Sequence, residues 1–138
     1  MGKNVKDVMT SNPTTVQSDA SVVEAARIMR DKDTGIVPVV ENDQLSGTIT
    51  DRDIAVRVVA EGRDPASTVV REIASTDVAT VEPEQDLSDA LRLMAERQVR
   101  RLPVVENGRL VGIVAQADVA RESDDSQTGE LVEEISKP

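Results

Sequence analysis

Two stretches of the chain carry the hydrophobic spacing of an amphipathic helix. Apolar residues at i, i+3, i+4 and i+7 give a helix one buried face. In the first stretch these residues are Val22, Ala25, Ala26 and Met29. In the second stretch they are Leu87, Ala90, Leu91 and Met94. Ser21 and Glu24 form a capping-box pattern before the first helix, and Asp86 is the expected N-cap of the second.

Apolar runs that are typical of strands follow each predicted helix. In the first half they are Val37–Val40 and Leu45–Ile49, separated by Asn42 and Asp43. The equivalent turn in the second half is Asn107-Gly108, and both of its residues tolerate the positive φ of a two-residue hairpin. The sequence therefore predicts one β-hairpin in each half.

A second helix is predicted after each hairpin. In the first half it runs from Thr50 to about Ala60, with Gly62 just past its end, and its counterpart begins near Gln116. An extended segment, Thr14–Val16, precedes the first helix. Each half is therefore predicted to be α+β, in the order strand–helix–strand–strand–helix, with a small mixed sheet.

The two halves are copies of one another. Displaced by 65 positions, the chain matches itself without a gap, so that Pro-Val-Val-Glu-Asn at 38–42 recurs at 103–107. A single half is too small to bury a satisfactory core, so we expect the halves to pack about a pseudo-two-fold axis. The predicted boundaries are 1–64 for the first repeat, 65–121 for the second and 122–138 for an acidic, flexible tail.

Composition narrows the functions open to the chain. The sequence contains no Phe, Tyr, Trp, Cys or His, which excludes aromatic stacking, disulfides, thiolate metal sites and the commonest general base. A net charge of −10 disfavours a nucleic-acid surface, and no apolar run is long enough for a membrane span. We therefore expect a cytoplasmic, non-catalytic protein. The acidic surplus is typical of a soluble surface; the alternative is an acidic face that meets a basic partner.

The two halves resemble CBS domains. The first copy carries Asp-Val-Met-Thr at 7–10, Ile-Val-Pro-Val-Val at 36–40 and Leu-Ser-Gly-Thr-Ile-Thr-Asp-Arg-Asp-Ile at 45–54. The second carries Val-Arg-Arg-Leu-Pro-Val-Val at 99–105 and Leu-Val-Gly-Ile-Val at 110–114. The order, spacing and duplication of these segments resemble a stand-alone CBS pair, or Bateman module, over residues 3–121.

This resemblance implies a sensor of adenosine-containing ligands: AMP, ADP, ATP or S-adenosylmethionine. In the family, the ligand lies in a cleft between the paired repeats. The residues that the first copy would supply are Thr14, Thr15, Gly35, Ile36, Val37, Pro38, Thr50 and Asp53. A hydroxyl suits phosphate and a carboxylate suits a ribose diol, while Arg52 adds a cation nearby. Thr50 and Asp53 also read as a plain helix start, so capping is the alternative role.

The second copy departs from the pattern. Ala115 stands where the first copy has Thr50, so the hydroxyl is lost and only Asp118 remains of the pair. Arg100 and Arg101 replace a Gly-Ile pair and bring cations to the mouth of the cleft, where Arg101 could hold a phosphate in bidentate fashion; an Arg-Glu surface pair is the alternative. The strand-entry residues of this copy are Leu102 and Pro103.

Two functions follow as hypotheses. One is a non-catalytic regulatory module that binds an adenosine-containing ligand and requires no cofactor. The other is a structural or protein-interaction dimer with no specific ligand. The resemblance implies a homodimer in either case, with a protein effector whose identity the sequence does not give.

Overall fold

The computed structural model describes residues 3–122 and divides the chain into two compact units. The first-repeat unit is the continuous stretch Thr14–Val78. The second-repeat unit combines the residues up to Pro13 with those from Ala79 onward. The predicted tail lies outside the described residues beyond Glu122.

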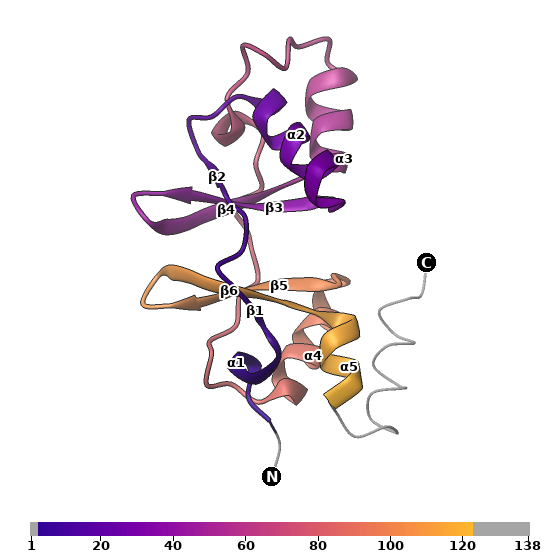
Figure 1. Ribbon diagram of the computed structural model, residues 1–138. Coiled ribbons are helices and arrows are strands. Elements are labelled where there is room, and N and C mark those ends of the chain that lie inside the picture. Colours follow the sequence, from indigo (N-terminus) through magenta and orange to yellow (C-terminus); the bar gives the residue numbers. More distant parts are fainter. Residues whose placement is uncertain (1–2, 123–138) are drawn as a thin grey trace. The chain divides into compact units, whose positions relative to one another are not determined.

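The first-repeat unit is built on a β-hairpin. Strand β3 pairs antiparallel with β4, and the short β2 pairs parallel with β3. Helices α2 and α3 contact this sheet, as Figure 1 shows. The elements are β2 (Val16–Gln17), α2 (Val22–Lys32), β3 (Ile36–Glu41), β4 (Gln44–Thr50), α3 (Asp51–Ile54), the π-helix η1 (Ala55–Val59) and the 3₁₀ helix η2 (Val70–Glu72).

The second-repeat unit has the same hairpin, with β5 antiparallel to β6. The counterpart of β2 is reduced to a single parallel bridge between Val81 and Val104. The elements are α1 (Val5–Val8), β1 (Thr10–Ser11), α4 (Leu87–Arg97), β5 (Arg101–Glu106), β6 (Arg109–Ala115) and α5 (Gln116–Glu122). The α+β class and the tandem arrangement are thus confirmed.

Both long helices begin at the predicted residues. Ser21 Oγ accepts a 3.2 Å hydrogen bond from the amide of Glu24. Asp86 occupies the N-cap of α4, but its side chain makes no capping hydrogen bond within residues 3–122. One predicted core position is wrong: Ala26 is exposed in its unit, whereas its counterpart Leu91 is buried. The methyl group of Ala26 is too short to fill the position that Leu91 fills.

Positive φ angles define both hairpin turns, as the sequence predicts. Asn42 and Asp43 have φ of 52° and 64°, and Asn107 and Gly108 have 54° and 80°. Two successive residues with positive φ match the twist of antiparallel strands. The turns therefore hold each hairpin in the same register.

The helix predicted from Thr50 to about Ala60 changes its winding along its length. After the single turn of α3, the chain continues as η1, where the amide of Ala60 bonds to the carbonyl of Ala55, five residues back. Gly62 follows the helix with a φ of 70°, consistent with its predicted place after the end. A π-helical turn is uncommon and often accompanies a functional site.

Each repeat is completed by a segment that precedes the other repeat in the sequence. The amide of Val5 bonds to the carbonyl of Gln85, and 65 positions later the amide of Val70 bonds to the carbonyl of Ala20, both at 2.8 Å. We call residues 3–11 and 68–75 the exchanged segments. The same offset relates two further pairings, Thr10 with Ile113 and Ser75 with Thr48.

Two glycines allow the exchanged segments to cross the hairpins. A Cβ on Gly47 would lie 2.5 Å from the carbonyl oxygen of Ser75, and one on Gly112 would lie 2.9 Å from that of Thr10. Backbone cannot yield as a flexible side chain can. Glycine is therefore required at both crossings.

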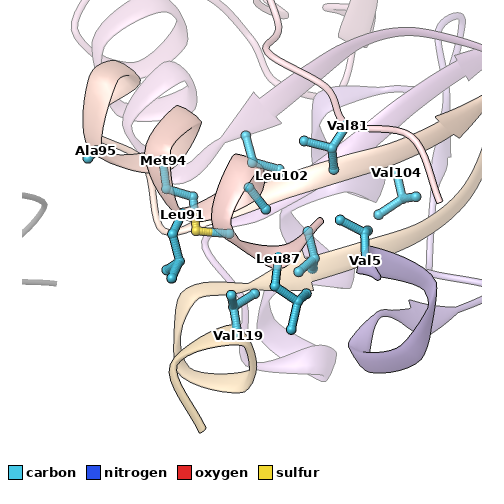
Figure 2. Close-up of a cluster of buried hydrophobic side chains, with 11 residues drawn as sticks. Val5, Val81, Leu87, Leu91, Met94, Ala95, Leu102, Val104 and Val119 are labelled. Atoms are coloured by element: carbon cyan, nitrogen blue, oxygen red, sulfur yellow. The ribbon is translucent and has the colours of Figure 1, made fainter. Parts of the chain in front are cut away.

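Each unit has its own aliphatic core. In the second-repeat unit the core joins α1, α4, α5 and the hairpin (Figure 2), through Val5, Val81, Leu87, Ala90, Leu91, Met94, Ala95, Leu102, Val104, Val114 and Val119. In the first-repeat unit it consists of Val16, Val22, Ala25, Met29, Val37, Val39, Ile49, Val58, Val70 and Ile73. Among the described residues, no helix combines the length and the apolar character that a membrane crossing requires.

Candidate functional site

The first-repeat candidates gather where the β3–β4 hairpin meets α3. Ile36 pairs with Thr50 across the hairpin, and the amide of Asp51 donates a 2.9 Å hydrogen bond to the carbonyl of Gly35. The strand entry and the helix start are thus adjacent because the antiparallel register puts the first residue of β3 opposite the last residue of β4.

Thr14 and Thr15 approach the same strand from the other side. β2 runs parallel to β3, with Val16 opposite Val39. Extending this register backwards puts Thr14 beside Val37 and Thr15 beside Pro38. Since β3 begins opposite Thr50, both threonines lie toward the same end of the sheet as Thr50. Thr14 is exposed and Thr15 is half-buried.

The strand pleat separates the apolar candidates. Val37 is 1% exposed and belongs to the core of the unit, so its side chain is not available to a ligand and only its backbone remains. Ile36 points to the opposite side of the strand and is half-buried. Pro38 is also buried. Of these three apolar candidates, Ile36 is therefore the one whose side chain is left accessible.

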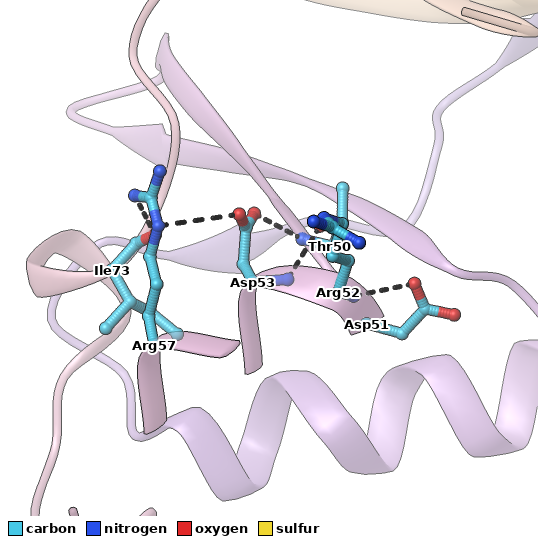
Figure 3. A network of polar contacts seen from close by, with 6 residues as sticks. All are labelled: Thr50, Asp51, Arg52, Asp53, Arg57 and Ile73. Atoms are coloured by element: carbon cyan, nitrogen blue, oxygen red, sulfur yellow. Dashed lines mark hydrogen bonds and ion pairs between the residues drawn. The ribbon is translucent and has the colours of Figure 1, made fainter. Parts of the chain in front are cut away.

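Thr50 and Asp53 form a complete capping box at the start of α3 (Figure 3). Thr50 Oγ1 accepts from the amide of Asp53 at 3.0 Å, and Asp53 Oδ2 accepts from the amide of Thr50 at 2.9 Å. The capping role is therefore confirmed. It leaves the hydroxyl proton of Thr50 free to donate, since that oxygen acts as an acceptor within the cap.

Arg57 extends this network, and the sequence reasoning missed it. Its Nε lies 3.9 Å from Asp53 Oδ1, and its Nη1 donates a 3.0 Å hydrogen bond to the carbonyl of Ile73. The i, i+4 spacing from Asp53 on a predicted helix is the signal that could have found the ion pair. The bond to Ile73 is a tertiary contact with no local signal.

Gly35 lies directly against Asp51. A Cβ at Gly35 would lie 2.9 Å from Asp51 Oδ2. The other carboxylate oxygen accepts from the amide of Arg52 at 2.8 Å. The Arg52 residue itself is exposed. Asp51, Arg52 and Asp53 thus place alternating charges along the helix start.

The second-repeat candidates occupy the equivalent places. Arg101 pairs with Ala115 as Ile36 pairs with Thr50, and the amide of Gln116 bonds to the carbonyl of Arg100 at 2.8 Å. Both arginines are exposed, whereas Leu102 is 1% exposed and belongs to the core. Pro103 is buried as well. The two cations therefore reach solvent at the strand entry.

Asp118 lies in a polar pocket of about 400 Å³. Its carboxylate is ion-paired with Arg121, one turn along α5. The pocket is lined by Asp7, Val8, Thr10, Asp118, Arg121 and Glu122. Three of these belong to the exchanged segment 3–11, which sequence reasoning did not connect with Asp118.

Glu122, one of the residues that line this pocket, is paired with Lys3. Lys3 Nζ lies 2.6 Å from Glu122 Oε2, and this hydrogen bond raises the pKa of Lys3. The pocket lining contains three carboxylates and one guanidinium. The pocket is therefore predominantly acidic, whereas the helix start at 51–53 carries alternating charges.

Two relatives and three solved structures resemble the chain over most of its length. CBS domain-containing protein YhcV of Bacillus subtilis is 47% identical over 117 residues, covering 85% of this chain and 83% of that protein. A crystal structure of Hypoxic Response Protein I with two coordinated zinc ions has a TM-score of 0.80 and 37% identity, covering 88% of this chain and 99% of that one. A protein of that name from Mycobacterium tuberculosis is 36% identical over 134 residues.

Two of the similar structures contain adenosine compounds. CBSX2 in complex with AMP has a TM-score of 0.76 and 29% identity, covering 87% of this chain and 95% of that one. The CBS domain pair of protein MJ0100, in complex with 5-methylthioadenosine and S-adenosyl-L-methionine, has the same TM-score and identity, covering 88% and 95%.

The crystal structure of Hypoxic Response Protein I holds two coordinated zinc ions, so metal-ligating side chains are of interest in the present chain as well. The present sequence lacks His and Cys. Within residues 3–122, no group of three or more acidic side chains is arranged to hold a metal ion.

The profile of the CBS domain matches residues 5–60 and again residues 70–125. These ranges follow the internal repeat and contain the two equivalent helix starts at Thr50 and Ala115. The chain belongs to the CBS-domain family and carries two CBS domains in tandem.

Proposed function

We propose that this protein is a non-catalytic regulatory module whose first repeat binds an adenosine-containing ligand. The observation that carries the proposal is the convergence of Gly35, Ile36, Thr50 and Asp53 at one end of the β3–β4 hairpin. These groups offer backbone polar groups, an apolar side chain, a hydroxyl and a carboxylate within one small region.

Each group has a defined part in the proposed complex. The Thr50 hydroxyl donates to a phosphate oxygen while it accepts from the amide of Asp53. Asp53 Oδ1 accepts from the ribose hydroxyls, because Oδ2 is held by the amide of Thr50. Ile36 packs against the purine, and Arg52 supplies a positive charge for a phosphate. Thr14 and Thr15 border the base.

We assign the second repeat a weaker or different ligand. Asp118 is paired with Arg121 and no hydroxyl stands at position 115. Arg100 and Arg101 supply cations at the strand entry, but the pocket around Asp118 is lined by further acids. The adenosine ligands of CBSX2 and MJ0100 make AMP and S-adenosylmethionine the first compounds to test.

A thermal-unfolding screen against AMP, ADP, ATP and S-adenosylmethionine tests the proposal. Ligand at 100 times its Kd stabilises a protein by about 2.7 kcal/mol, which is readily measured. Calorimetry then compares Asp53→Asn with Asp118→Asn, and we expect the first to weaken binding more. Loss of a charge-assisted hydrogen bond costs about 1.5–3 kcal/mol.

The ligand-free melting temperature of each variant is the control, because Asp53 also caps α3. Equal losses of affinity in the two variants would contradict the assignment to the first repeat. A screen in which none of the four compounds raises the melting temperature would overturn the proposed function.

The second candidate function is that of an interaction dimer, and one observation favours it. Val56 and Val59 are 47% and 69% exposed on η1, which makes them the large hydrophobic side chains left open to solvent among residues 3–122. Exposed apolar residues on one helix are typical of an interface. We propose a homodimer that covers this helix, in the cytoplasm, with or without the nucleotide.

A further inference from the structure

Arg57 contacts both the candidate site and an exchanged segment. Its Nε lies 3.9 Å from Asp53 Oδ1, and its Nη1 donates a 3.0 Å hydrogen bond to the carbonyl of Ile73. The Asp53 side chain is only 12% exposed. Figure 3 shows the line of contacts from Thr50 through Asp53 and Arg57 to Ile73.

Ile73 is firmly held in the first-repeat unit. It is 1% exposed, and its amide donates to the carbonyl of Val70 at 3.1 Å. Two residues later, Ser75 exchanges two 2.9 Å backbone hydrogen bonds with Thr48 of β4. The position of the Ile73 carbonyl therefore depends on how the whole segment 68–75 sits against the sheet.

In the first repeat, the link to the exchanged segment runs from the aspartate of the helix start through Arg57, and the second repeat is built differently. The residue that corresponds to Arg57 is Glu122, which has the opposite charge and binds Lys3. Asp118 is paired instead with its neighbour Arg121. Both repeats therefore tie their last helix to an exchanged segment, through Arg57 in the first repeat and through Glu122 in the second. In the second repeat this tie does not involve Asp118, the counterpart of Asp53.

We propose that Arg57 is a positioning residue that couples ligand occupancy at Asp53 to the exchanged segment 68–75. The inference rests on the proposed function, since it concerns the same site. Oδ2 of Asp53 is held by the amide of Thr50, so a ribose hydroxyl binds at Oδ1, the oxygen that faces Arg57. A ligand hydroxyl at Oδ1 shares that oxygen with the guanidinium of Arg57. Ligand binding therefore alters the hydrogen bond from Arg57 Nη1 to the carbonyl of Ile73.

The coupling acts in both directions, as linkage requires. If ligand binding changes the strength of the Arg57–Ile73 contact, then loss of that contact changes ligand affinity by the same factor. The chain continues from this segment into the second repeat. A change in segment 68–75 on ligand binding is therefore transmitted along the chain to the start of the second repeat.

Calorimetry with AMP as the probe tests the positioning role. We expect Arg57→Gln to weaken binding about three- to fivefold, the size of a partly exposed charge pair. The matched control is Arg63→Gln, which removes an ion pair to Glu72 in the same segment without touching Asp53. Its effect on affinity should stay below about twofold.

A double variant separates positioning from a merely structural effect. In an Asp53→Asn background, Arg57→Gln should cause no further loss of AMP affinity, because Arg57 acts through that carboxylate. Independent, multiplying losses in the two variants would overturn the inference.

Hydrogen exchange gives the second readout. In the wild type and in Arg63→Gln, saturating AMP should change the protection of the Ala74 and Ser75 amides, and in Arg57→Gln it should not. Unchanged protection in the wild type with AMP bound would overturn the coupling.

The ligand-free protein distinguishes failure of this inference from failure of the proposed function. If the wild type binds no adenosine ligand, the proposed function fails. The melting temperatures of the single and double variants at Asp53 and Arg57 still test whether these two residues are energetically coupled. Non-additive shifts in melting temperature support the coupling, and additive shifts overturn it.

Discussion

The residue before the last helix differs between the two repeats by a hydroxyl group. Thr50 and Ala115 hold the same register position, each opposite the first residue of its hairpin. In the first repeat the hydroxyl caps α3 and also presents a proton to solvent; in the second repeat a methyl group can do neither. The second repeat therefore lacks both the cap and the hydroxyl donor that the first repeat has at this position.

Ala115→Thr should restore the missing cap. A threonine at an N-cap stabilises a protein by about 0.5–2 kcal/mol relative to alanine, so the free energy of unfolding in urea should rise. If the second repeat is a degenerate nucleotide site, the stoichiometry in calorimetry with AMP should rise as well. A variant that is no more stable than the wild type would contradict the equivalence of positions 50 and 115.

Sequence reasoning reached the cap but not the contacts beyond it. The Thr50–Asp53 pair is local, because its members are three residues apart and their spacing alone brings them together. Arg57 bonds to Ile73, 16 residues away, and the partner is a backbone carbonyl. No side-chain pattern reveals which carbonyl will be near, so this contact required the structure.

At the level of elements, the helices and hairpins were predictable and the exchanged segments were not. Hydrophobic spacing located α2 and α4, and turn residues located both hairpins. The segments 3–11 and 68–75 are too short to show a hydrophobic periodicity. Each packs with the repeat that does not directly follow it in the sequence, and nothing in its residues indicates this. The π-helical winding of η1 also lacks a sequence signal, because the same apolar spacing suits an α-helix.

Gly47→Ala should destabilise the first-repeat unit by about 1–3 kcal/mol, as overpacking does. The new Cβ would lie 2.5 Å from the Ser75 carbonyl oxygen, and that backbone has to move. The measurement is urea unfolding. Gly62→Ala is the control, since its Cβ meets nothing within 4 Å and only its φ of 70° is strained. A cost at Gly47 no larger than that at Gly62 would argue against the tight crossing.

For the whole molecule, the compact units cut across the repeats. The first-repeat unit, Thr14–Val78, is continuous and contains its exchanged segment. Chain length alone argues against a stable half, but this unit has a core of its own that includes Val70 and Ile73. A fragment of residues 14–78 should therefore fold, giving dispersed amide resonances and a cooperative melt. The fragment 1–64 keeps the first repeat but loses Val70 and Ile73 from the core, and it should not fold cooperatively. Equal behaviour of the two fragments would contradict this division.

The exposed valines of η1 bear on the assembly. Val56→Asp together with Val59→Asp should shift the sedimentation of the protein from a dimer to a ~15 kDa monomer, because buried unpaired charges oppose association; the chain mass is 14.9 kDa. Ala55→Asp is the control, because it adds a charge at an exposed position of the same helix without replacing a large hydrophobic side chain. A wild type that sediments only as a monomer would remove the dimer from the proposal.

The exchanged segments also set an order of events during synthesis. Residues 3–11 are made before the first-repeat unit, yet their partners in the second-repeat unit are made after it. The first-repeat unit is complete once Val78 has been made. At about 5–20 residues per second, the chain between Val78 and Glu122 takes roughly 2–9 s, and for that time residues 3–11 lack their partners. The first-repeat unit can therefore fold before the segment 3–11, which was made ahead of it, finds its place.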